Sequence, residues 1–250
     1  MLTENRKKMV RGVLIGCLII ALSSISYAGV GGSKHDMTIA GAAGGFSGNF
    51  GGDNDEPCVY CHTPHGSYTG AQTPLWNKTL SFASGFTVYS SATMDSTPTN
   101  PPSTISLLCL SCHDGVGAIN SILNTPGPGS TPLTVSGFDQ IGDTGLDPAT
   151  GRPFFFNIGE GDPTGPAAPV NLSNDHPVSI NWADKGIVGA GGFLATPTAP
   201  ARLVSVGGVN KVECTSCHNP HNGTAFELGG MQFMLMSNSG SALCLACHDK

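Results

Sequence analysis

Four Cys-x-x-Cys-His motifs are the residues of this chain best suited to chemistry. They use eight of the nine cysteines and four of the eight histidines. Two thiols separated by two residues can each form a thioether bond to one porphyrin, and the adjacent imidazole then ligates the iron as its proximal ligand. The spacing therefore predicts four covalently bound c-type haems. The predicted attachment and proximal-ligand residues are Cys58, Cys61 and His62; Cys109, Cys112 and His113; Cys214, Cys217 and His218; and Cys244, Cys247 and His248.

Cys-x-x-Cys pairs also build zinc sites and disulfide redox centres, so these are the alternatives to haem. A zinc ribbon would use two such pairs for each metal ion and would not need a histidine directly after each pair. All four pairs here are followed by a histidine. This regularity favours haem attachment over both alternatives.

The other histidines equal in number the iron positions that the motifs leave open, which predicts six-coordinate haems with two histidines each. They are His35, His65, His176 and His221. His65 follows His62 too closely, across the stiff Pro64, to reach the opposite face of the same haem, so it is expected to ligate a neighbouring one. The simplest assignment gives His35 to the haem on Cys58 and Cys61, His65 to that on Cys109 and Cys112, His176 to that on Cys214 and Cys217, and His221 to that on Cys244 and Cys247.

Two alternatives to this ligand set remain open. His65 and His221 could be surface histidines or could contact haem propionates. Methionine ligation is also conceivable because Met231, Met234 and Met236 cluster, although methionines at this spacing more often pack in a core.

The motifs come in two pairs, which indicates duplication of a two-haem module. Each module reads His, then Cys-x-x-Cys-His-x-Pro-His, then Leu-Cys-Leu-x-Cys-His-Asp. The predicted organisation is a signal peptide over residues 1–28, a first module over 29–120, a Gly/Pro-rich linker over 121–170 and a second module over 171–250. Short helices are expected at 106–113 and 241–248, a strand at 154–156, and a β-hairpin over 202–213 that turns at Gly207 and Gly208 and leads into Cys214.

The composition is unusual for a chain that must bury its own core. It includes 35 Gly and 18 Pro, with only 11% charged and 7% aromatic residues. Such a chain has little apolar side-chain surface to offset the entropy of ordering. The predicted fold class is a multihaem cytochrome c of mostly irregular coil, with short helices at the haem motifs, a few short strands, and a core formed by the haems. The net charge of −6 argues against nucleic acid as a partner.

The N-terminus has the pattern of a secretion signal. Basic residues between positions 6 and 11 precede an apolar run over 13–22, and Ser26-Tyr27-Ala28 before Gly29 is a small-x-small cleavage site. The apolar run is shorter than the about 20 residues that span a membrane, so export without stable membrane insertion is expected. Cys17 leaves one alternative, because Leu14-Ile15-Gly16-Cys17 resembles a lipoprotein cleavage box that would attach lipid there.

The order Cys-x-x-Cys-His-x-Pro-His, then Leu-Cys-Leu-x-Cys-His, resembles that of the doubled-CXXCH multihaem cytochromes c. With its signal peptide and Gly/Thr-rich loops, the chain is similar more narrowly to tetrahaem cytochromes that polymerise into extracellular filaments in metal-reducing bacteria. That resemblance implies a continuous stack of haems, one axial histidine from an adjacent subunit, and electron transport along the polymer. His35 lies on a glycine-rich arm that could cross such a subunit boundary.

Iron with both axial positions filled offers no site for a substrate, so electron transfer rather than enzymatic activity is expected. The expected partners are copies of the chain in a head-to-tail polymer, other redox cytochromes and extracellular acceptors. The expected location is extracellular or at the cell surface, and otherwise periplasmic. The alternatives are a monomeric periplasmic carrier, an electron-entry subunit of an oxidoreductase complex, and a multihaem reductase with one five-coordinate haem.

Overall fold

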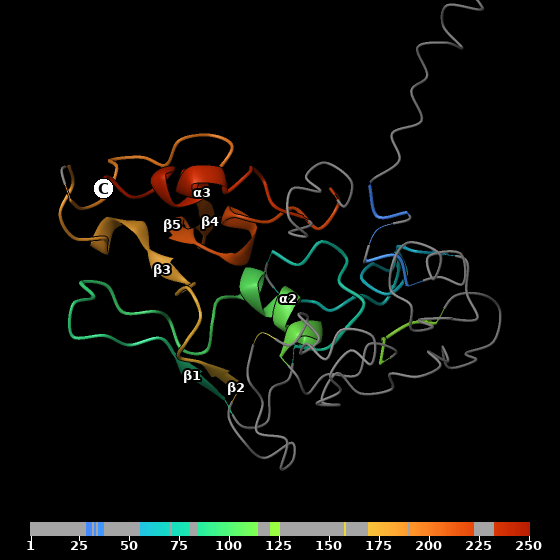
Figure 1. Cartoon of the computed structure of the whole chain (residues 1–250). Coiled ribbons are helices and arrows are strands. Elements are labelled where there is room, and N and C mark those ends of the chain that lie inside the picture. The colour runs from blue at the N-terminus through green and yellow to red at the C-terminus, as the bar shows by residue number, and fades with distance from the viewer. Residues whose placement is uncertain are drawn as a thin grey trace, which may run out of the picture.

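Regular secondary structure is short and widely spaced along the chain (Figure 1). The computed structural model describes residues 29–31, 33, 35–37, 56–70, 72–80, 85–114, 121–125, 158, 170–189, 191–222 and 233–250. The predicted signal peptide with Cys17, the strand expected at 154–156 and Met231 lie outside these ranges. The described elements are β1 (Phe86–Val88), α2 (Thr104–His113), β2 (Val170–Leu172), β3 (Ile180–Asn181), η2 (Trp182–Asp184), β4 (Val204–Val206), β5 (Val209–Val212), η3 (Cys214–Ser216), η4 (Ser239–Ser241) and α3 (Ala242–Leu245). The prediction of coil with short helices and strands is confirmed.

The longest of these elements, α2, carries the third and fourth cysteines of the motifs. Ser103 at its N-cap has extended φ and ψ of −67° and 159°, and two prolines that precede it lack the amide hydrogens needed to continue the helix upstream. The helix ends at Asp114, whose amide donates to the carbonyl of Leu110. The helix expected at 106–113 is therefore confirmed and begins two residues earlier.

A small apolar core joins α2 to two strands from distant parts of the chain. β1 and β2 pair in parallel, with Phe86 opposite Val170 and Val88 opposite Leu172. The buried members of the core are Phe86, Leu110, Val170 and Leu172. Figure 1 shows the two strands beside α2. Val170, which the sequence analysis placed at the end of the linker, is thus the first residue of a strand that contacts the first module. That haems supply the rest of the core stays a prediction.

The predicted hairpin is present as β4 and β5. The strands pair antiparallel, from Val204 opposite Lys211 to Val206 opposite Val209. Gly207 and Gly208 both have left-handed φ, 59° and 84°, as the tightest two-residue hairpin turn requires. β3 pairs with the outer side of β5, and η3 begins directly after Glu213, so the hairpin leads into the third motif as expected.

The duplication extends to the backbone hydrogen bonds. The amide of Asn77 donates to the carbonyl of Cys61 over 2.9 Å, and the amide of Leu235 donates to the carbonyl of Cys217 over 2.8 Å. Backbone amides of any residue type can make these bonds, so the two segments fold alike although their side chains differ. The segment after each opening Cys-x-x-Cys-His therefore returns to the second cysteine in the same way.

The two returning segments also share an uncommon backbone conformation. Leu75 and Phe233 are non-glycine residues with φ of 55° and 67°. Each has a carbonyl that accepts from the residue after a motif histidine, Thr63 over 2.9 Å and Asn219 over 2.7 Å. A left-handed leucine or phenylalanine is disfavoured by the contact of its Cβ with the backbone, so its recurrence at matching places marks a true structural repeat.

The described residues include no helix that is both long and apolar enough to cross a membrane.

Candidate haem attachment sites

Each motif folds as a helical turn that brings its first thiol and its imidazole to one side. The fourth and fifth residues of the Cys109 motif complete α2. In the other three motifs the histidine amide donates to the carbonyl of the first cysteine: His62 to Cys58 over 2.8 Å, His218 to Cys214 over 3.0 Å, and His248 to Cys244 over 2.8 Å. Residues four apart in a helical turn lie on the same face, which is the arrangement that thioether attachment with a proximal imidazole needs.

The donor set fits haem better than zinc or a disulfide centre. All eight motif cysteines are free thiols. Within the described ranges, no three side chains of His, Cys, Asp or Glu come together closely enough to hold a metal ion. A structural zinc site needs four such ligands around one point, and two pairs do not converge in this way here. Each pair instead has its own imidazole, as one porphyrin per motif requires.

Three histidines have the ring nitrogen Nε2 free for a metal. Nδ1 donates to a backbone carbonyl in each: in His62 to Pro74 over 2.6 Å, in His35 to Pro220 over 3.4 Å, and in His176 to Pro177 over 3.0 Å. A hydrogen bond from Nδ1 fixes the tautomer, so the lone pair of Nε2 is available. This is the usual arrangement of an imidazole that ligates a metal.

The thiols of paired motifs lie close to one another in both modules. Burial raises the pKa of Cys61 to about 12, and the neighbouring Cys112 adds to the rise. In the second module, burial raises the pKa of Cys217 to about 11, and Cys247 is the next largest cause. In each module, therefore, the second cysteine of the opening motif lies in the neighbourhood of the second cysteine of the closing motif.

The two modules also meet through thiols. The neighbouring thiol of Cys214, together with burial, raises the pKa of Cys109. The amide of Cys214 donates over 3.2 Å to the hydroxyl of Ser106, which lies in α2 with Cys109. Cys109 belongs to the closing motif of the first module and Cys214 to the opening motif of the second. The attachment points of all four motifs thus form one continuous series along the molecule.

A buried carboxylate that the sequence analysis missed holds this junction. Glu213 is 1% exposed and accepts hydrogen bonds from the hydroxyls of Ser103 and Ser106, and from that of Ser179 over 3.1 Å. Ser106 also accepts from the amide of Cys214 over 3.2 Å. No local pattern predicts this role, because the three serines lie far from Glu213 in the sequence.

Two pairs of imidazoles lie close together, one across the two modules and one within the first module. The ring centroids of His62 and His221 lie 6.0 Å apart with an interplanar angle of 26°. The ring centroids of His35 and His113 also lie 6.0 Å apart, and the interplanar angle of these two rings is 59°. These juxtapositions differ from the assignment expected from chain order, which gave His35 to the first motif and His221 to the last.

The position of His35 explains the difference. Its arm lies along the second module, where Gly29 forms a β-bridge with Asn222, and its ring stacks on Phe233 at 4.1 Å. Burial lowers the pKa of His35 to about 4, and the nearby His113 is the second cause. A contact between segments so distant in the sequence cannot be inferred from the order of the motifs.

The remaining histidines lie nearer the surface. His65 and His176 are exposed, and His218 retains an exposed edge. The ring of His248 lies 4.6 Å from that of Phe193, and after burial the charge of His176 is the next cause that lowers the pKa of His248.

Met234 forms a β-bridge with His218, as Trp76 does with His62, and Met234 is buried. Its place matches that of a packing side chain in the other module, which supports the packing interpretation of this methionine.

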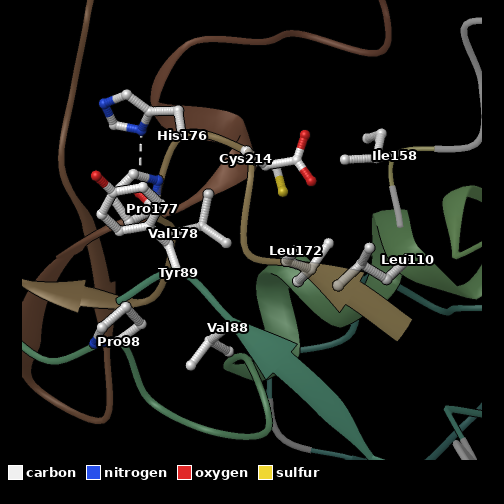
Figure 2. A pocket seen from close by; sticks show the side chains of 11 residues that line it. Val88, Tyr89, Pro98, Leu110, Ile158, Leu172, His176, Pro177, Val178 and Cys214 are labelled. Atoms are coloured by element: carbon white, nitrogen blue, oxygen red, sulfur yellow. Dashed lines mark hydrogen bonds between the residues drawn. The ribbon is translucent and has the colours of Figure 1, made fainter. Parts of the chain in front are cut away.

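An apolar hollow, partly open to solvent, adjoins the thiol of Cys214 (Figure 2). Its walls include Leu110, Leu172 and Val178. Figure 2 shows the ring of His176 at the rim, turned away from Cys214. A hollow with apolar walls beside an attachment thiol fits part of a flat apolar macrocycle.

A protein-family model described as a doubled CXXCH motif matches residues 207–250, which hold the hairpin turn and both motifs of the second module. This match supports a multihaem c-type cytochrome. In such a protein the CXXCH motifs hold covalently bound c-type haem, and the expected activity is electron transfer. No curated protein matches the chain.

Proposed function

We propose that the chain is an exported tetrahaem c-type cytochrome that carries electrons between its haems and assembles head to tail into extracellular filaments. The observation that carries the electron-transfer proposal is the contact between the modules, where the amide of Cys214 donates over 3.2 Å to Ser106 of the helix that also holds Cys109. This contact joins the attachment residues of the two modules into one series. Groups attached along such a series lie close together, and close spacing is what rapid transfer between them needs.

The eight motif cysteines would hold the four haems, and His62, His113, His218 and His248 would be the proximal ligands. Bound haem supplies one-electron chemistry, because its iron changes between the ferric and ferrous states. The polypeptide orients the ligands: the bond from His62 Nδ1 to the carbonyl of Pro74 holds that imidazole with Nε2 outward. The bonds that Glu213 accepts hold the two modules at a fixed separation.

Head-to-tail assembly is supported by an exposed apolar segment near the last motif. Ile187 is 75% exposed and Val188 is 53% exposed. This segment is tied to the last motif, because Val188 forms a β-bridge with Phe193, which itself forms a bridge with His248. An apolar surface beside a terminal redox group is suited to contact with a second copy of the chain, and a contact of this heterologous kind builds a filament if it does not close.

The test is expression of the whole chain in a host that attaches c-type haem to exported proteins. The intact mass is expected to equal the mature polypeptide plus four haems, and reductive titration is expected to take up four electrons per chain. Electron microscopy of the secreted fraction is expected to show filaments. A colourless product at the bare polypeptide mass would refute the whole proposal, whereas four haems in a monodisperse monomer would refute only the assembly and favour a periplasmic carrier.

A further inference from the structure

We propose that the distal ligands follow one rule in both modules: the upstream histidine ligates the closing haem of its own module, and the histidine after Cys-x-x-Cys-His-x-Pro ligates the opening haem of the other module. The ligand pairs are His35 with His113, His176 with His248, His221 with His62, and His65 with His218. This inference rests on the proposed haem content and assigns the ligands within it.

The first support is the separation of two imidazole pairs. A bond from a metal to an imidazole nitrogen is about 2 Å long, so rings on opposite faces of one metal have centroids about 6 Å apart. The rings of His62 and His221 lie 6.0 Å apart at their centroids. His62 also has Nε2 free, since its Nδ1 donates to the carbonyl of Pro74. The pair therefore has the spacing of two ligands on one iron.

The second pair has the same spacing on a different motif. The centroids of His35 and His113 lie 6.0 Å apart. Phe233 stacks on one face of the His35 ring at 4.1 Å, and Nδ1 donates to the carbonyl of Pro220. These contacts orient the ring independently of any metal. His35 is the upstream histidine of the first module, and His113 belongs to the closing motif of that module.

The structural repeat extends the rule to the second module. The bonds from Asn77 to Cys61 and from Leu235 to Cys217 show that the two modules fold alike after their opening motifs. His176 occupies the upstream place in the second module, as His35 does in the first. Its ring points away from Cys214, the first thiol of the opening motif (Figure 2).

The last pair follows from the repeat. His221 of the second module faces His62 of the first. The equivalent residues with the modules exchanged are His65 and His218, both of which are exposed. The rule then uses every histidine once and fills every axial position from one chain. A head-to-tail filament would be held by surface contacts such as those of Ile187 and Val188, without a shared ligand.

The experiment counts carbon monoxide bound by the fully reduced holoprotein, because CO binds ferrous iron that lacks a distal ligand. H221A is expected to bind one CO per chain. The variant C58A/C61A/H221A lacks the first opening haem and is expected to bind none, since that haem is the one His221 ligates. The matched control C244A/C247A/H221A lacks the second closing haem and is expected to keep the bound CO.

The reverse pattern, with CO lost only in C244A/C247A/H221A, would overturn the rule in favour of the assignment by chain order. Intact mass gives the haem count of the wild-type protein and of each variant. If the proposed function fails, the wild-type protein itself lacks covalent haem. If only the ligand rule fails, the haem counts are as expected and the CO pattern is reversed. If the variants that lack a haem do not fold, H221M in the four-haem protein gives the same answer. The methionine methyl resonance is expected to show contacts to the thioether groups of Cys58 and Cys61, and contacts to those of Cys244 and Cys247 would overturn the rule.

Discussion

The hydroxyl of Ser106 in α2 donates to the carboxylate of Glu213, the residue directly before the third motif. The bond joins the two modules at the place where Cys109 meets Cys214. Glu213 is 1% exposed, and its partners Ser106 and Ser179 are fully buried, so these groups have little access to water. Each of these modules therefore depends on the other for the geometry of its attachment residues.

Glu213→Ala is expected to destabilise the holoprotein by about 3 kcal/mol, because each buried hydroxyl left without an acceptor costs about 1–3 kcal/mol. In a chain of this size the melting temperature would fall by about 10 °C. Differential scanning calorimetry of holoprotein with a verified haem count measures this. Asp184→Ala, at an exposed carboxylate, is the control and is expected to change stability by less than about 0.5 kcal/mol. Equal losses in both variants would show that the serine network contributes nothing specific.

Asn77→Asp is expected to destabilise the first module. The Asn77 side chain is fully buried, and its amide nitrogen donates to the carbonyls of Val59 over 2.7 Å and Asn124 over 2.9 Å. A carboxylate cannot donate these bonds, and an uncompensated buried charge costs about 3–5 kcal/mol. Burial raises the pKa of the introduced carboxyl, and its neutral form donates one bond, so the loss should be larger at pH 8 than at pH 4.

Urea unfolding at the two pH values measures that effect. Asn210→Asp, in the exposed hairpin, is the matched control and is expected to leave the midpoint nearly unchanged at both. A loss of stability at pH 4 as large as at pH 8 would contradict the assigned role of the amide hydrogens.

Gly208→Val is expected to weaken the hairpin that leads to Cys214. Gly208 has a φ of 84°, and a side chain in the left-handed region costs about 1–2 kcal/mol per residue. Gly208→Asn is the control, because asparagine tolerates this conformation better. The melting temperature should therefore be highest for the wild-type protein, lower for the asparagine variant and lowest for the valine variant. An unchanged melting temperature in the valine variant would mean that the turn is not formed as described.

The hairpin and the helix at the Cys109 motif were predictable, because each depends on residues close together in the sequence. Gly207 and Gly208 between two β-branched runs specify their turn locally. The spacing of two residues between cysteines likewise needs no knowledge of the fold.

The contacts between modules were not predictable for the opposite reason. His35 was expected to serve the nearest motif, but its arm follows the second module through the bridge between Gly29 and Asn222. The parallel pairing of β1 with β2 was missed because each strand is only three residues long, too short for a periodic pattern. The repeat after the opening motifs was hidden because backbone atoms make it, and Asn77 and Leu235 share no side-chain chemistry.

Removal of haem is expected to unfold the chain. Within the part of the chain that the structure describes, the apolar cluster of α2, β1 and β2 is small, with Phe86, Leu110, Val170 and Leu172 as its buried members. A sequence with 35 Gly, 18 Pro and 7% aromatic residues offers little further apolar side-chain surface to offset the entropy of ordering. Protein made without haem attachment should lack near-ultraviolet circular dichroism and a cooperative melting transition. The holoprotein, treated identically, is the control and should show both. Native-like dichroism in the haem-free chain would show that the polypeptide supplies its own core.

The wild-type holoprotein is expected to bind neither cyanide when oxidised nor carbon monoxide when reduced. Eight histidines suffice for four six-coordinate irons, and two pairs already lie at the separation that a shared metal requires. Absorption spectra recorded before and after ligand addition measure this, with H35A as the positive control because it should expose the iron opposite His113. A wild-type spectrum that shifts as much as that of H35A would reveal an open haem, and it would favour a reductase over an electron carrier.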